Sequence, residues 1–328
     1  MRRIVYRMAG GSIYGARTQA FKLPQQIQAR TYIAPDKTRV LAISEGLWDL
    51  QKESTFTNIA AMLTVDAACS MFDEIEFEQL YKQDDDELKI HLIYPIEKKL
   101  DEFAKYINTS RKYNLDASLL LLAINRGRYI WLDSSAGFIY SINTSESGTS
   151  KFTFDKVFTQ RDPIVNPCSV RLEYADHRIS AGKGKVPTDI LGYVLLSPKM
   201  KLCDPLGELP DEYGDGIISD CVDKVLTYGQ ESESSAIIRS IMRNRFPRIR
   251  TDDDVAMLIY TQIESEWLLR GEEEQELTCE VFDAAQDENG TDLNHDCFMN
   301  PVFNHDQDEV ELKEFYHNCF RTPELDKE

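Results

Sequence analysis

The order in which strand-like and helical segments follow one another is the feature that most restricts the fold of this 328-residue chain. Short apolar or alternating runs predict strands, and apolar residues at helical spacing predict helices. A group of strands comes first, then two helices, more strands, two more helices and a final strand. Because the helices arrive in pairs between groups of strands, the order predicts an α+β protein with antiparallel sheets flanked by helix pairs.

The predicted strands cover residues 3–8, 28–33, 39–44, 117–124, 129–132, 138–142, 152–158, 169–174, 190–197 and 255–263. The predicted helices begin at Ser54 or Thr55 and near residues 92, 217 and 234, the second of them running to about residue 113. We expect the acidic run at residues 84–87 to be a solvated loop and the Gly- and Lys-rich stretch 180–187 to be an exposed loop. Because short polar turns separate residues 117–124, 129–132 and 138–142, these three are predicted to be adjacent antiparallel strands of one buried sheet.

Negative charge is concentrated at the C-terminal end of the chain. The net charge is −19, and residues 271–328 contain 18 acidic residues against three basic ones, a net charge of −15. We therefore predict one domain over residues 1–268 and an acidic extension over residues 269–328. The remaining, nearly neutral body offers no electrostatic footprint for nucleic acid or a membrane surface, whereas the acidic extension favours a basic protein partner.

Cysteine usage and hydropathy predict the compartment. The longest apolar run, residues 119–124, is far shorter than the roughly 20 residues that a membrane span requires. Met1-Arg2-Arg3 is not followed by the apolar core of a signal peptide. Seven scattered cysteines without a CxxC pair are typical of reduced thiols, so we expect a cytoplasmic protein.

Five local motifs carry a family resemblance. A predicted strand ends in Glu45-Gly46 within LAISEGLWDL, a later strand reads DASLLLLAI at residues 116–124, and Ser135-Ala136-Gly137-Phe138 form a turn after it. Residues 193–199 read YVLLSPK, and Asp253-Asp254 precede the apolar run VAMLI. In this order, over about residues 10–265, the motifs resemble those of the metal-dependent (PPM, type 2C) Ser/Thr protein phosphatases. The resemblance implies an α-β-β-α four-layer sandwich of two antiparallel sheets between helix pairs.

The resemblance also implies a place for two divalent cations. It assigns Glu45, Gly46 through its carbonyl, and Asp253 to the metal site, and Arg17 to phosphate binding. Two-metal hydrolysis needs several converging carboxylates that hold both cations around a shared hydroxide. Here Ala136 and Pro198 replace two of the family's aspartates, and Arg17 is followed by TQAFKLPQQ instead of the family's Asn-Glu-Asp.

Two functions follow from this incomplete ligand set. The first is a catalytically degenerate pseudophosphatase with a vestigial metal site, no catalytic residue and no cofactor, which acts as a binding or regulatory module for a protein partner. The alternative is a divergent, active phosphatase that uses Mn²⁺ or Mg²⁺ and takes its missing ligands from Asp49, Asp133 or Asp254. The sequence leaves the identity of the partner and the oligomeric state open.

Overall fold

The computed structural model describes residues 4–20, 24–47, 57–108, 115–144, 151–158, 168–176, 178–198, 200, 211–228, 231–245 and 254–264. All of them belong to one compact unit, Met1–Thr278. The predicted boundary between residues 268 and 269 and the acidic extension beyond it lie outside the described residues. No helix in the described part of the chain is long and apolar enough to cross a membrane.

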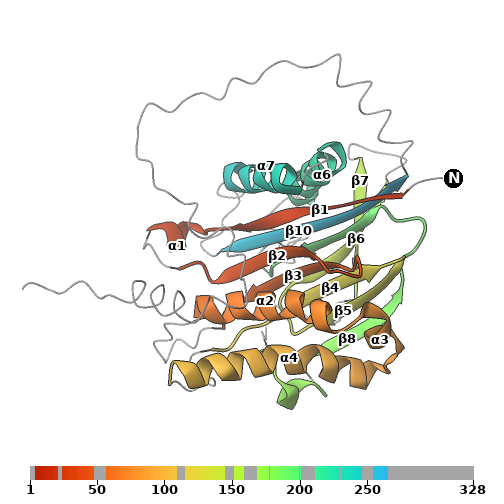
Figure 1. Ribbon diagram of the computed structural model, residues 1–328. Coiled ribbons are helices and arrows are strands. Elements are labelled where there is room, and N and C mark those ends of the chain that lie inside the picture. Colours follow the sequence, from red (N-terminus) through yellow and green to blue (C-terminus); the bar gives the residue numbers. More distant parts are fainter. Residues whose placement is uncertain are drawn as a thin grey trace, which may run out of the picture. The chain divides into compact units, whose positions relative to one another are not determined.

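Two antiparallel five-stranded sheets form the centre of the fold (Figure 1). The first sheet has the order β1 (Ile4–Ile13), β10 (Val255–Glu264), β9 (Gly192–Leu196), β6 (Phe138–Thr144) and β7 (Phe152–Val157). The second sheet has the order β2 (Ile27–Ile33), β3 (Arg39–Glu45), β4 (Leu120–Asn125), β5 (Arg128–Asp133) and β8 (Ser180–Lys185).

Helices cover the outer face of each sheet, as Figure 1 shows. The first sheet carries α6 (Asp211–Thr227) and α7 (Glu231–Arg245), and the second sheet carries α2 (Thr57–Glu74) and α4 (Asp85–Tyr106). Short helices α1 (Ala16–Ala20), α3 (Phe77–Lys82) and η1 (Leu172–Tyr174) lie in the connections. The predicted α+β, four-layer sandwich is confirmed.

The central strand β4 shows why the sequence needs four layers. Its residues LLLAIN are all buried, so neither face of the strand meets solvent. Successive side chains of a strand point to opposite faces. Leu120 and Leu122 accordingly join the core between the two sheets, whereas Leu121 and Ala123 join the core beneath α2 and α4. A third core, containing Ile238 of α7, fills the space between the first sheet and its helices.

The prediction that residues 138–142 continue the same sheet as the two preceding strands is wrong. β4 and β5 are neighbours in the second sheet, but β6 pairs with β9 and β7 in the first. The chain crosses between the sheets in the turn that contains Ser135, at φ 64°, and Gly137, at φ 158°. Gly137 has no room for a side chain, because a Cβ there would overlap the carbonyl oxygen of Leu196. This close approach docks β6 beside β9.

Two segments predicted as loops belong to regular elements. The stretch 180–187 contains β8, which pairs with β5 along its whole length. Its two glycines face the rings of Trp131 and Tyr129, which take the space that side chains would otherwise fill. The acidic run at 84–87 starts α4, because the Asp84 side chain accepts hydrogen bonds from the backbone of residues 86 and 87.

Three other predicted elements differ from those in the structure. The strand predicted at residues 169–174 is wrong, since η1 lies there. The helix predicted over residues 92–113 begins seven residues earlier, at Asp85, and ends at Tyr106. β1 is longer than predicted and runs through Gly10 and Gly11, both at positive φ.

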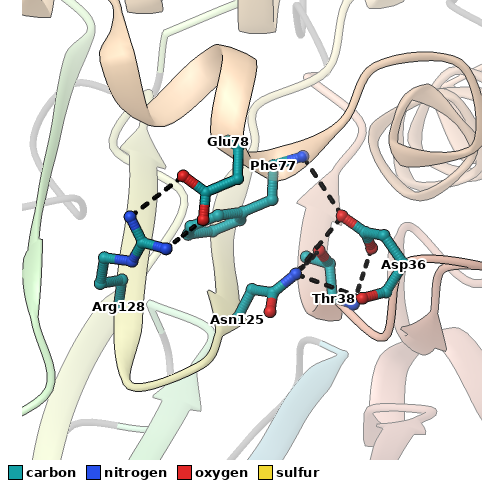
Figure 2. A network of polar contacts seen from close by, with 6 residues as sticks. All are labelled: Asp36, Thr38, Phe77, Glu78, Asn125 and Arg128. Atoms are coloured by element: carbon teal, nitrogen blue, oxygen red, sulfur yellow. Dashed lines mark hydrogen bonds and ion pairs between the residues drawn. The ribbon is translucent and has the colours of Figure 1, made fainter.

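A partly buried polar network closes the end of the second sheet at which β3 begins (Figure 2). One carboxylate oxygen of Asp36 accepts from the backbone N–H of Thr38 at 2.8 Å, and the other accepts from the N–H of Phe77 and from Asn125 Nδ2, each at 3.3 Å. Burial alone would raise the pKa of Asp36, but the hydrogen bonds from Thr38, Phe77 and Asn125 lower it below the ordinary value. The network therefore ties the β2–β3 turn to α3 and to the β4–β5 turn.

Candidate functional site

The predicted metal residues Glu45 and Gly46 lie at the opposite end of β3 from Asp36. Glu45 is half-buried and is the last residue of the strand. Its backbone carbonyl accepts from the N–H of Ser118 at 2.9 Å, and Gly46 forms an isolated bridge with Ala117. The Gly46 N–H donates to the carbonyl of Gln26 at 2.9 Å. Sheet hydrogen bonding thus continues past the end of β3 on both sides.

Gly46 is held tightly by the beginning of α2. A Cβ at this position would overlap the carbonyl oxygen of Thr57 and lie 2.8 Å from the Thr57 Cβ. The Thr57 hydroxyl also bonds the side chain of Gln26. Residue 46 must therefore be glycine because the beginning of α2 lies too close to the strand end for a side chain.

Asp254 comes to the same end of the sandwich from the first sheet. It directly precedes β10 and is 3% exposed. One of its carboxylate oxygens accepts from the N–H of Gly15 at 2.8 Å, and the other accepts from the N–H of Gln26 at 2.6 Å. Because Gln26 bonds Asp254 through its N–H and Gly46 through its carbonyl, one peptide segment connects the two predicted site regions.

The turn that crosses between the sheets is closed by its own polar groups. Asp133 Oδ1 accepts from the N–H of Ala136 at 3.0 Å, and Ser134 Oγ accepts from the N–H of Leu119 at 2.7 Å. Ala136 is fully buried and belongs to the core between the sheets. The position at which the resemblance implies an aspartate is therefore occupied by a core side chain.

The end of β9 is closed in a similar way. Ser197 Oγ accepts from the N–H of Ala256 at 2.9 Å, and the Ser197 N–H donates to the Ala256 carbonyl at 3.0 Å. Pro198 follows and is buried. Ser197 thus extends the pairing of β9 with β10, and the next position carries no ligand.

A basic residue lies near the strand end beyond Gly46. The carbonyl of Asp116 accepts from the Leu47 N–H at 2.8 Å, and its carboxylate accepts from Ser169 Oγ and from two nitrogens of Arg171. Burial alone would lower the pKa of Arg171, but the bond to Asp116 and the charges of its neighbours raise it above the ordinary value. This pair fastens residues 168–171 across the ends of β4 and β5.

Comparison with solved structures identifies the architecture. A bacterial serine phosphatase carrying an R161A mutation superposes with a TM-score of 0.51 at 10% identity, covering 80% of this chain and 99% of that one. The chain has the PPM-type phosphatase fold. Stp1 from Staphylococcus aureus matches with a TM-score of 0.48 at 12% identity, covering 80% of this chain and 95% of that one. PppA from Pseudomonas aeruginosa matches with a TM-score of 0.48 at 16% identity, covering 80% and 100%.

No protein-family model matches the sequence, and no curated protein sequence matches it. At 10% identity the likeness to the serine phosphatase concerns the PPM-type fold and not the chemistry of the site.

The described residues do not fit a two-metal centre within the PPM-type fold. In this part of the chain no three His, Cys, Asp or Glu residues lie where they could hold a metal ion. Two of the alternative ligands, Asp133 and Asp254, already accept backbone hydrogen bonds. The third, Asp49, lies outside the described residues, as do Asp253 and the side chain of Arg17.

The structure therefore brings together Gly46, Gln26 and Asp254 and leaves Asp253 and the Arg17 side chain undescribed. Sequence reasoning missed Gln26, which contributes backbone groups that no motif marks. Asp254 was considered only as a spare ligand. Its position directly before an apolar strand was the available signal for a buried, hydrogen-bonded carboxylate.

Proposed function

We propose that this chain is a pseudophosphatase, a catalytically degenerate protein of PPM-type fold that acts as a binding or regulatory module. The observation that carries the proposal is the state of Asp254. Both of its carboxylate oxygens accept backbone N–H groups from Gly15 and Gln26, in a position that is 3% exposed. A carboxylate used in this way ties the edges of the two sheets together.

The chemistry of phosphate hydrolysis supports the same conclusion. Hydrolysis with two cations requires carboxylates that bridge them and a bound hydroxide in line with phosphorus. Ala136 and Pro198 provide no side-chain oxygen at two of the expected positions. Glu45 is one methylene longer than aspartate, which shifts its oxygens by about 1 Å or more in a site that tolerates little displacement.

The expected partner is a protein, and the acidic residues 271–328 favour a basic one. A cytoplasmic location is part of the proposal. It is supported by the widely spaced cysteines, of which Cys69, Cys168 and Cys221 are buried in the described part of the chain.

Hydrolysis of a phosphoserine peptide by the full-length protein tests the proposal. Release of phosphate is measured with Mn²⁺, with Mg²⁺ and with EDTA, for the wild type and for Glu45→Ala and Asp253→Ala. We expect the same background rate in every sample. We also expect Glu45→Ala to cost only roughly 0.5 kcal/mol of stability, as a change at a partly exposed strand end.

Turnover that depends on Mn²⁺ and disappears in either variant would establish the active-phosphatase alternative. Turnover that persists unchanged in both variants comes from a contaminating enzyme, which a further purification step removes. The rate of phosphate release measured after that step decides the test.

A further inference from the structure

A second polar feature lies on the outer face of the first sheet, on α7. The side chain of Arg239 lies along the backbone of β1 at Gly11, where a Cβ would be 3.2 Å from its Cδ and from its Nη1. The Arg239 side chain can pack this closely because Gly11 has no side chain of its own. The side chain is half-buried, and this burial, followed by the charge of Arg243, lowers the pKa of Arg239.

Arg243 is the neighbour of Arg239 on the helix surface, because residues four apart lie about 5–6 Å apart at their Cβ atoms. It is exposed. Among the residues that the structure describes, no carboxylate forms an ion pair with either arginine. Two like charges at this spacing repel, and one of them is also partly desolvated. The arrangement is therefore unfavourable until an anion joins it.

The surrounding sequence has the same sign of charge. Residues 234–251 contain five arginines and no acidic residue, a net charge of +5 in a chain whose net charge is −19. Of these five arginines, the structure describes the side chains of Arg239 and Arg243 on α7, and their positive charge attracts an anionic group.

We propose that Arg239 and Arg243 form a binding site for the phosphate group of a phosphorylated protein segment. A phosphomonoester carries about −1.5 to −2 charge at pH 7, which balances two guanidinium groups, and its three terminal oxygens can accept from both. A carboxylate carries one charge and would leave the pair under-compensated. A nucleic acid brings a long run of negative charge toward a strongly acidic protein, whereas a phosphopeptide presents a single compact dianion.

This site is separate from the vestigial metal region. Arg239 lies on α7 and packs against β1 at Gly11, on the outer side of the first sheet. Asp254 turns toward Gly15 and Gln26 at the end of the sandwich. The inference is therefore independent of whether the chain hydrolyses phosphate, and it goes beyond the proposed function by naming a ligand class and a second surface.

Fluorescence anisotropy with a labelled phosphoserine peptide and its unphosphorylated twin tests the inference on the full-length protein. We expect the phosphopeptide to bind at least tenfold more tightly than the twin. Arg239→Gln and Arg243→Gln should each weaken phosphopeptide binding about tenfold and leave the twin unchanged. Arg239→Lys should weaken it less, since it keeps the charge but loses the planar fork.

Lys105→Gln is the matched control, because Lys105 is an exposed cation near the end of another helix, α4. It should bind the phosphopeptide like the wild type. Circular dichroism checks that each variant is folded, and the exposed Arg243 keeps the test decisive if Arg239→Gln unfolds. Equal binding of the two peptides, an unchanged affinity in Arg243→Gln, or tighter binding of a single-stranded oligonucleotide than of the phosphopeptide would overturn the inference.

Discussion

Replacing Asp254 with asparagine separates a structural carboxylate from a metal ligand. In the wild type both oxygens accept backbone N–H groups, from Gly15 at 2.8 Å and Gln26 at 2.6 Å. Asparagine keeps one acceptor oxygen and turns an NH₂ group toward the other donor. One hydrogen bond is lost, a buried N–H is left without an acceptor, and the remaining bond loses its charge assistance.

The expected cost follows from these changes. A hydrogen bond to a charged group contributes about 1.5–3 kcal/mol, and an unsatisfied buried donor costs about 1–3 kcal/mol. Because the two figures describe overlapping effects, we expect Asp254→Asn to lower the free energy of unfolding by about 3 kcal/mol. With an m value of about 3 kcal/mol/M, the urea midpoint should fall by about 1 M.

Urea denaturation followed by circular dichroism and by tryptophan fluorescence measures this change, with and without Mn²⁺. Asp189→Asn is the control, since Asp189 is exposed in a turn and should shift the free energy of unfolding by no more than about 0.5 kcal/mol. The loss in Asp254→Asn should be the same in both buffers. A midpoint at or above that of the wild type would refute the structural role. A Mn²⁺-induced stabilisation of the wild type that the variant lacks would instead make Asp254 a metal ligand.

Further predictions concern Asp36, in the turn before β3, and Gly46, which directly follows β3. Hydrogen bonds hold the pKa of Asp36 below its ordinary value, so its stabilising effect is present above the ordinary carboxyl range and is lost as the pH falls through the folded-state value. Asp36→Asn should therefore cost about 1 kcal/mol in urea melts at pH 7, and the cost should shrink as the pH falls below the ordinary carboxyl range; a constant difference would contradict the assignment. Gly46→Ala should lower the free energy of unfolding by about 1–3 kcal/mol through its overlap with Thr57. Gly216 lies in α6 with open space where a methyl group would be added, so Gly216→Ala should stabilise by about 0.5–1 kcal/mol in the same urea melts. Equal effects of the two glycine changes would contradict the packing argument.

The sequence alone was sufficient for the layers of this fold. The apolar run of β4 identified a buried strand, and the helical spacing in residues 56–71 identified the helix that became α2. The motifs placed Ala136 and Pro198 at positions where the PPM resemblance implies aspartates. These features are visible in sequence because side-chain periodicity and residue type are local properties.

Tertiary structure decided which elements pair and what the polar groups bind. β6 joins the first sheet because the close approach of Gly137 to Leu196 directs it there, and β8 is a strand because Trp131 and Tyr129 cover its glycines. Composition alone predicted an exposed loop at these glycines, within residues 180–187. The partners of Asp254 lie 239 and 228 positions away in the chain. A carboxylate before a strand has the same local sequence whether it binds a cation or two backbone N–H groups, so only the folded arrangement distinguishes the two.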